Sequence, residues 1–432
     1  NKGEVVGDSL NADNLARGFS YDQLHGMVEL PTLGGLISAA YAVNDDGMVV
    51  GYAVDSNRHT RAALWVAGDV VDLNERIEDK KWTLTRAVDI NNKGEIIVVG
   101  ESGGLRQKLL LIPNSHGDLT QRYNIVHLKN FSEVYEINEV GHVAGLIVAT
   151  PSNGNFYQAG VWRNGQFIEL GLMGCRSTVS NCVSSGFGIN NDSVVTGSSN
   201  IANSFSPYYQ HAFITVNDTL KKILTLGGEF SSGESINDAG YITGYSRDTY
   251  CNPDCTYYTH AFLWRGNDDV IDLGTLGGRR SFGNAINNAG TVVGYADVAG
   301  NKSYHAVRWV NEQIEDLGTL GGLRSKAIDI NDDGKIVGIS YTTEGKVHAF
   351  IWRSGLGMMD LGMFKANAIN SNGVVVGKSK RKAVIYEDQR LLDLNHLISS
   401  DSGWELWEAR DINSDGVVVG MGNKGVFMLT PM

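Results

Sequence analysis

The chain has 432 residues, of which 42% are hydrophobic, so it can bury a large core. Its 53 glycines and 6 prolines favour many tight turns between strands over a disordered linker. Its formal net charge of -12 argues against a nucleic-acid partner, which would need a basic stripe to replace counterions. No apolar run reaches the roughly 18 residues that cross a bilayer, so we expect no transmembrane segment.

One pattern, Ile-Asn-x-x-Gly-x-Val-Val-Gly, recurs along the whole chain, and Ser193 takes the place of its first Gly once. That first Gly stands at Gly3, Gly47, Gly94, Gly141, Gly240, Gly290, Gly334, Gly373 and Gly416. The intervals cluster near 45 residues, which is about the length of a four-stranded propeller blade. The repeats therefore predict an all-β fold, a β-propeller of about nine four-stranded blades, in a single domain over residues 1–432.

The N-terminus falls inside a repeat, because the chain opens directly on the glycine pattern at Gly3. We expect that preceding residues, including a signal peptide, are missing from this sequence. Residues 1–25 predict an additional hairpin with no assigned place in the ring. Met27–Leu33 then predicts a spare outer strand.

Each complete unit predicts four strands in a fixed order. In one example, Lys326–Asn331 forms the first strand, Lys335–Ser340 the second and His348–Trp352 the third, while Gln313–Leu320 is the fourth strand of the preceding unit. The Asn-x-x-Gly segment between the first two strands predicts a hairpin turn. Its Gly supplies a positive φ and its Asn side chain bonds the turn backbone.

Four cysteines lie in two polar, loop-like segments. Cys175 and Cys182 flank one segment, and Cys251 and Cys255 flank the other. Neither pair has Cys-x-x-Cys spacing and no His stands at zinc-finger distance, so we predict two local disulfides and no metal. Disulfides imply an oxidising compartment.

The C-terminus supplies three strands, 407–413, 417–420 and 426–429, and stops before a fourth. Pairing these strands with Met27–Leu33 would complete a blade and close the ring, which leaves only short protected edges. A ten-unit ring, two smaller rings and an open spiral are the alternatives.

The repeats resemble the HAF-repeat family, which is named for a His-Ala-Phe tripeptide. The tripeptide stands at 211–213, 260–262 and 348–350, and a companion Asp-Leu-Gly-Thr-Leu-Gly-Gly stands at 272–278 and 316–322. The resemblance spans the whole chain and implies a secreted or surface-associated bacterial protein of propeller type. It implies no particular activity and no cofactor.

Two residues that recur in the units are interpreted as structural. The repeated His is expected to hydrogen-bond the Gly-Gly loop of its own or a neighbouring blade, because a catalytic site uses each residue once. The Trp that follows four residues later, as in Trp264, Trp309 and Trp352, is expected to pack between blades.

Aromatic loop residues form the candidate site. In propellers the connections after the second and fourth strands share one face, and here they carry the longest insertions, 198–210 and 247–259. Tyrosines can stack on sugar faces or anchor a protein, and paired arginines can hold a carboxylate or sulfate. The candidate ligand-binding residues are Tyr208, Tyr209, His211, Tyr257, Tyr258, His260, Arg279 and Arg280.

The first hypothesis is an extracellular, non-enzymatic binding or adhesion module that recognises a glycan or a protein through this loop face. The alternative is a polysaccharide lyase on a propeller, in which Tyr258, His260, Arg279 and Arg280 would neutralise a uronate and move its proton. A third hypothesis is a structural subunit of a surface assembly. The sequence leaves the ligand and the oligomeric state open.

Overall fold

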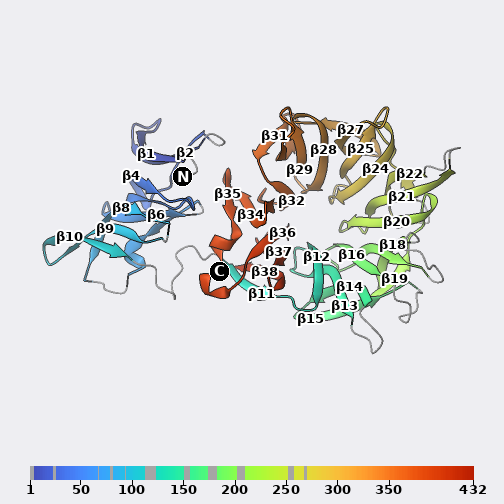
Figure 1. Ribbon diagram of the computed structural model, residues 1–432, viewed down its shortest axis with the longest axis horizontal. Helices are drawn as coiled ribbons and strands as arrows, with labels where there is room; N and C mark the ends of the chain where they lie inside the picture. Colours follow the sequence, from blue (N-terminus) through green and yellow to red (C-terminus); the bar gives the residue numbers. More distant parts are fainter. Residues whose placement is uncertain are drawn as a thin grey trace. The chain divides into compact units, whose positions relative to one another are not determined.

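The computed structural model describes most of the chain, and strands dominate it (Figure 1). The described residues are 4–22, 26–66, 68–77, 81–92, 94–111, 123–149, 156–173, 182–201, 210–251, 257–266 and 270–432. Within these ranges the helices are three short 3-10 turns, Leu73–Glu75, Leu394–Leu397 and Ser400–Ser402, and no helix is long and apolar enough to cross a membrane. The predicted all-β class is confirmed.

The chain forms two compact units. The first comprises Asn1–Arg122, Tyr386–Leu392 and His396–Gly403, and the second comprises Tyr123–Ile385, Asp393–Asn395 and Trp404–Met432. The repeats therefore do not build one continuous ring.

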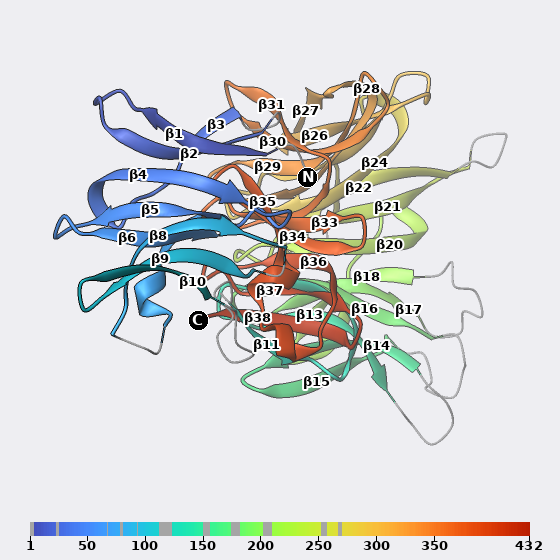
Figure 2. The same cartoon turned by 60° about the vertical axis from the view of Figure 1, so that its left-hand side comes forward.

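The first unit holds three antiparallel sheets that stack in the order of the sequence (Figure 2). Their strands are β1 (Val5–Leu10), β2 (Ala16–Asp22) and β3 (Gly26–Glu29); β4 (Gly34–Val43), β5 (Val49–Asp55), β6 (Thr60–Val66) and β7 (Asp69–Asp72); and β8 (Thr83–Ile90), β9 (Ile96–Ser102) and β10 (Leu105–Leu111). The predicted N-terminal hairpin is β1–β2, and it pairs with β3. The spare strand at Met27 thus completes this small sheet, because pairing with an adjacent hairpin costs far less loop entropy than pairing with the distant C-terminus.

The other described strands form seven four-stranded antiparallel blades, which we number 1 to 7; they belong to the second unit, except that residues 386–392 of blade 6 group with the first. A parallel bridge between Thr259 and Arg280 joins blades 3 and 4 into one sheet. Blades 1 to 3 are β12 (Phe131–Ile137), β13 (Val143–Ala149), β14 (Phe156–Arg163) and β15 (Gln166–Gly171); β16 (Ser184–Ile189), β17 (Val195–Asn200), β18 (Gln210–Val216) and β19 (Thr219–Lys222); and β20 (Gly227–Ile236), β21 (Ile242–Cys251), β22 (Tyr257–Trp264) and β23 (Val270–Asp272).

Blades 4 to 7 follow the same order. They are β24 (Gly277–Ile286), β25 (Val292–Val298), β26 (Tyr304–Val310) and β27 (Gln313–Gly318); β28 (Gly321–Ile330), β29 (Ile336–Thr342), β30 (Val347–Arg353) and β31 (Gly357–Gly362); β32 (Lys365–Ile369), β33 (Val375–Ser379), β34 (Lys382–Glu387) and β35 (Arg390–Asp393); and β36 (Leu406–Ile412), β37 (Val418–Gly422) and β38 (Gly425–Pro431) with β11 (Tyr123–His127).

The asparagine of the repeated turn closes the blades into a ring. In each turn its Oδ1 accepts backbone N–H groups, as predicted, for example from Thr291 onto Asn287. Its Nδ2 also donates to the backbone carbonyl of the corresponding asparagine in the next blade. These bonds run from Asn138 to Asn190, Asn237, Asn287, Asn331, Asn370, Asn413 and back to Asn138. The circle of bonds returns to its start after seven blades, so the ring is closed.

Two expectations about the ring are therefore wrong. The circle of bonds joins seven blades rather than about nine, because the three sheets of the first unit take no part in it. The closing strand is β11, which pairs antiparallel with β38 through Ile125 and Leu429, and not Met27–Leu33. Strand β11 directly precedes blade 1, so it reaches the last blade as soon as the ring returns.

Repeated side chains join each blade to the next. Ser281 accepts a hydrogen bond from the Ala261 N–H of the preceding blade and donates to Gly274 O. Trp309 donates from Nε1 to Leu273 O of the preceding blade at 2.7 Å and is 1% exposed. The predicted packing of this tryptophan between blades is confirmed.

Candidate functional site

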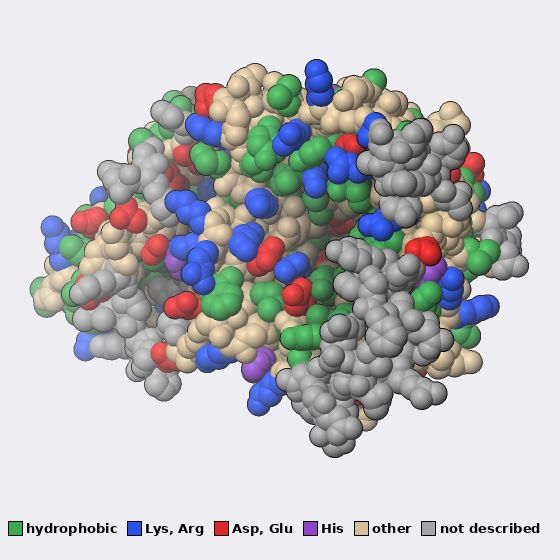
Figure 3. Space-filling model, turned by 45° about the vertical axis from the view of Figure 1, so that its right-hand side comes forward, with side chains coloured by type: hydrophobic (Ala, Val, Ile, Leu, Met, Phe, Trp, Pro, Cys, Tyr) green, Lys and Arg blue, Asp and Glu red, His purple; other side chains and the backbone are tan. Residues whose placement is uncertain are grey.

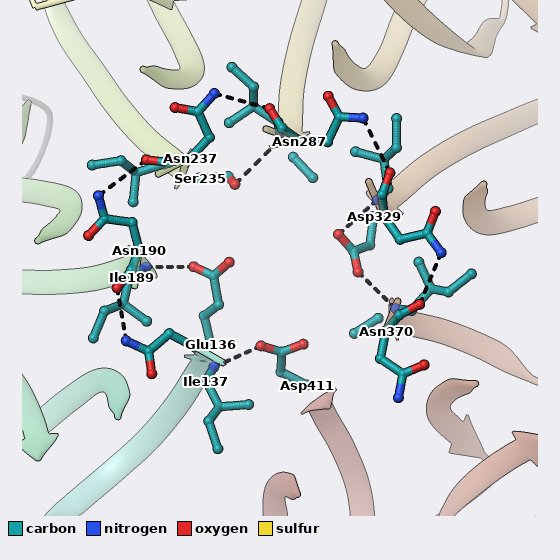
Figure 4. Close-up of a pocket in the computed structure, with 18 of the residues that line it drawn as sticks. Glu136, Ile137, Ile189, Asn190, Ser235, Asn237, Asn287, Asp329, Asn370 and Asp411 are labelled. Atoms are coloured by element: carbon teal, nitrogen blue, oxygen red, sulfur yellow. Dashed lines mark hydrogen bonds between the residues drawn. The ribbon is translucent and has the colours of Figure 1, made fainter. Parts of the chain in front are cut away.

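The inner strands of the second unit surround a cavity of about 260 Å³ on the ring axis (Figure 4). Its wall includes four carboxyl groups, which belong to Glu136, Glu234, Asp329 and Asp411. Each stands just before, or two residues before, the Ile-Asn of its repeat, so the strand places it beside the axis. None of these four groups is in the predicted site, because the repeat pattern begins at the Ile-Asn that follows them.

Three of these carboxylates tie neighbouring blades together (Figure 4). Glu136 accepts from Ile189 N at 2.6 Å and Asp329 from Ile369 N at 2.8 Å. Asp411 accepts from Ile137 N at 2.7 Å, which spans the seam between blade 7 and blade 1. Ser235 occupies the same position in blade 3 and accepts from Ile286 N at 3.4 Å.

The cavity carboxyls are hard to ionise. Protein surrounds them although each keeps some surface towards the cavity, and this burial raises the pKa of Asp329 to about 6. Burial and repulsion from Asp411 raise the pKa of Glu136 well above the usual range, and burial and repulsion from Asp329 raise the pKa of Asp411 to about 8. No described group of His, Cys, Asp or Glu side chains is arranged to hold a metal ion. The cavity groups therefore act on blade packing.

The repeated histidines bind an aspartate and not the Gly-Gly loop. The Nδ1 atom of His260 lies 2.8 Å from the Asp272 carboxylate, on the fourth strand of the same blade. The pairs His305–Asp316 and His348–Asp360 repeat this geometry. Asp272 also accepts from Gly274 N, so the pair fixes the start of the Gly-Thr-Leu-Gly-Gly segment. The hydrogen bond to Asp272 raises the pKa of His260 against the opposing effect of burial.

His211 lacks this partner. Lys222 pairs with Phe213 in the register where Asp272 pairs with Phe262, so a lysine stands in place of the aspartate. Burial and the Lys222 charge lower the pKa of His211 to about 4. His211 is only 5% exposed, which does not favour its predicted contact with a ligand.

The structure describes only part of the predicted tyrosine and cysteine set. Tyr208, Tyr209, Cys175 and Cys255 lie outside the described residues, as do the side chains of Tyr257 and Cys251. Tyr258 is half-buried, with its ring 6.2 Å from the ring of His260. Cys182 is buried and disulfide-bonded, and the pairing of the four cysteines stays a prediction.

The predicted arginine pair lies on β24 and is exposed. Arg280 donates from Nε to Asp297 at 2.8 Å and from Nη2 to its second oxygen at 3.4 Å. The backbone of Arg280 also meets that of Thr259 in a parallel bridge, which brings β22, the strand of Tyr258 and His260, against β24. Arg280 and His260 are thus on neighbouring blades.

Beside these residues runs a line of half-buried rings that we call the aromatic row, formed by Phe230, Tyr245, Phe282, Tyr295 and Tyr304. Successive ring centroids are 5.9, 5.0, 4.7 and 5.4 Å apart. The rings come from the first two strands of blade 3 and the first three of blade 4, on the side opposite the asparagine turns. None of these five residues is in the predicted site, although a tyrosine follows both Gly244 and Gly294 in the second strands of blades 3 and 4.

Cations lie over this row. Lys326 Nζ is 4.1 Å from the ring centroid of Tyr295 and 5.1 Å from that of Tyr304. The Arg324 guanidinium carbon lies 5.5 Å from the Tyr304 centroid, and that of Arg247 lies 5.2 Å from the Phe230 centroid. Figure 3 shows one face of the molecule on which Lys and Arg side chains gather around hydrophobic ones. The row therefore combines half-buried rings with positive charges that lie over them.

Comparisons with known proteins find β-propeller structures, with low sequence identity and low TM-scores. No family model matches the chain, and no curated protein matches it. Among solved structures, the chain is similar to a gluconolactonase from Xanthomonas campestris, at 9% identity over 73% of this chain and 93% of that one, with a TM-score of 0.36. TolB from Acinetobacter baumannii gives 13% identity, 78% and 76% coverage and a TM-score of 0.40. The β-propeller domain of the Trilobed protease from Pyrococcus furiosus gives 8% identity over 73% of this chain and 93% of that one, with a TM-score of 0.28. Likeness at this level transfers no activity.

Proposed function

We propose that this chain is an extracellular, non-enzymatic binding module with HAF-type repeats, which holds a glycan against the aromatic row of its second unit. The observation that carries the proposal is the row itself. Five rings in mutual contact on adjacent strands form a rigid platform, and a ligand that lies on it pays little ordering entropy. Aromatic rings interact with the apolar faces of sugars, and the adjacent cations can receive polar substituents.

The lyase alternative receives less support. Its proposed base, His260, makes the same Asp contact as His305 and His348, and three equivalent copies indicate a repeated structural pair. We therefore favour binding without chemistry.

A glycan array probed with the purified full chain tests the proposal, with a parallel absorbance scan for unsaturated uronate product. Tyr304→Ala removes the last ring of the row, and we expect it to weaken glycan binding about tenfold, as interface aromatics often do. Tyr157→Ala is the matched control, because Tyr157 is an exposed tyrosine on blade 1, outside the row. Absence of glycan binding, or formation of unsaturated product, would overturn the proposal.

A further inference from the structure

The strongest unexplained feature of the row is a pair of cations without acidic partners. Among the described residues, neither Lys326 nor Arg324 forms an ion pair or a side-chain hydrogen bond, and both lie over tyrosine rings. Other cations in this unit form ion pairs, for example Lys382 with Asp393 and Arg308 with Glu315. In a chain with a formal net charge of -12, this local excess of positive charge is distinctive.

The surroundings of Lys326 disfavour the charged form of its side chain. Its side chain is half-buried on β28, between the rings of Tyr295 and Tyr304. Burial and the nearby positive charge of Arg280 lower the pKa of Lys326. A half-buried cation beside a second cation is destabilising unless an anion joins them. The arrangement thus leaves a place for negative charge.

Arg280 is oriented to share that anion. Its contact with Asp297 uses the Nε edge of the guanidinium. The Asp297 side chain is only 3% exposed, so this buried carboxylate fixes the orientation of the guanidinium. A guanidinium has five N–H donors, and the Asp297 contact uses two of them. The Arg280 side chain is 55% exposed, so its remaining donors are accessible to solvent.

We propose that the aromatic row binds an acidic glycan, with the carboxylate of one uronate unit held by Lys326, Arg324 and the free donors of Arg280 while its sugar ring lies against Tyr304. This inference rests on the proposed glycan binding and adds the substrate class. A few cations at one end of a row of rings suit a single carboxylate on a sugar better than the repeating phosphates of a nucleic acid, which need a continuous basic track.

The test is calorimetric binding of the full chain to oligosaccharides of pectate, alginate and hyaluronan, each beside its carboxyl-reduced neutral counterpart. We expect at least one acidic form to bind about tenfold or more tightly than its neutral counterpart, as loss of a charge-assisted contact typically costs. Arg324→Gln and Lys326→Met should each abolish that preference. Arg353→Gln is the matched control, since Arg353 is an exposed arginine of the same blade at the end of β30.

The outcomes separate this inference from the proposed function. Equal affinity for the acidic and neutral forms would overturn the inference and leave glycan binding intact, whereas no binding on any glycan would overturn both. Tighter binding of a single-stranded oligonucleotide than of every acidic oligosaccharide would also overturn it. Arg324 is exposed, so Arg324→Gln should fold even if Lys326→Met does not, and an unchanged acid preference in Arg324→Gln would count against the inference.

Discussion

His211 occupies the place of a repeated histidine, yet a lysine stands where the other blades supply an aspartate. Its pKa is lowered to about 4 from an ordinary value of 6.5, so the folded protein resists protonation at this site. The stability that the neutral His211 contributes is therefore present above pH 6.5 and is lost as the pH falls towards 4. A depression of about 2.5 units, at about 1.4 kcal/mol per unit, corresponds to about 3 kcal/mol.

Lys222→Asp should restore the His–Asp pair in blade 2. We expect the pKa of His211 to rise to 6.5 or above, and the loss of unfolding free energy between pH 6.5 and 4 to shrink by up to about 3 kcal/mol. NMR titration of the imidazole and urea unfolding across this range measure the two effects. The control is Lys221→Asp, whose side chain precedes it on the opposite face of β19. An unchanged His211 pKa in Lys222→Asp would contradict the argument.

At this scale the sequence predicts a residue's role where that role depends on its own turn or strand. The asparagine turns and the Trp309 contact are examples, because hairpin geometry and an alternating strand suffice to derive them. The partner of His260 is harder to predict, since it depends on how the third and fourth strands align. The acids at Glu136 and Asp411 are harder still, because they meet only where the closed ring brings blade 7 against blade 1.

The asparagine turn is the element that joins each blade to the next. Asn287→Asp keeps an oxygen that accepts from Thr291 N but loses the amide that donates to Asn331 O. Asn331 O keeps its bond from Gly334 N but loses the link to Asn287, which is 6% exposed, and a carboxyl oxygen then faces it, so we expect a loss of about 2 kcal/mol in unfolding free energy. Asn311→Asp, at an exposed turn of blade 4, should change the stability little. Urea unfolding compares the two variants, and equal effects would show that the turn bond alone matters.

Strand order within a blade could be predicted from the sequence, whereas the closing strand could not. The segment Tyr123–His127 is short and lacks the Asp-Leu-Gly motif of other fourth strands, so only its pairing with β38 reveals its role. Met27–Leu33 resembled a free fourth strand because its own sheet begins inside a repeat. The row of rings was missed for a related reason, since Tyr245 and Tyr295 meet only through Phe282 on the neighbouring strand.

At the scale of the whole ring, the seam between blade 7 and blade 1 has a single apolar anchor next to β11. Leu128 is 1% exposed and packs in one cluster with Val426 and Met428 of blade 7 and with Phe131 and Val134 of blade 1. Leu128→Ala should cost about 3 kcal/mol and speed hydrogen exchange in β11 and β38. Leu224→Ala removes the same atoms from a side chain that is 47% exposed and should cost far less. Faster exchange confined to β11, with global stability unchanged, would show that the ring does not depend on its seam.

The cavity carboxyls should make the stability of the ring fall as the pH rises. Burial raises the pKa of Asp411, Glu136 and Asp329, so the stability they contribute is fully present below about pH 4 and is lost as the pH rises through the folded-state values, which for Asp329 is about 6. Between the pKa of a carboxyl in the unfolded chain and its higher pKa in the folded protein, the unfolding free energy falls by about 1.4 kcal/mol per pH unit for each such group.

Asp411→Asn removes one titrating group from this set, together with its repulsion with Glu136. The amide has only one oxygen, so either the Ile137 N–H or the Ile412 N–H loses its acceptor. We therefore expect the variant to be less stable than the parent at pH 5, by about 1 to 2 kcal/mol, and the difference to narrow or reverse by pH 8. Urea unfolding at pH 5, 6, 7 and 8 measures this, with Asp415→Asn, an exposed carboxyl of the same blade, as the control. Parallel stability curves for the parent and Asp411→Asn would mean that the cavity carboxyls do not titrate with folding.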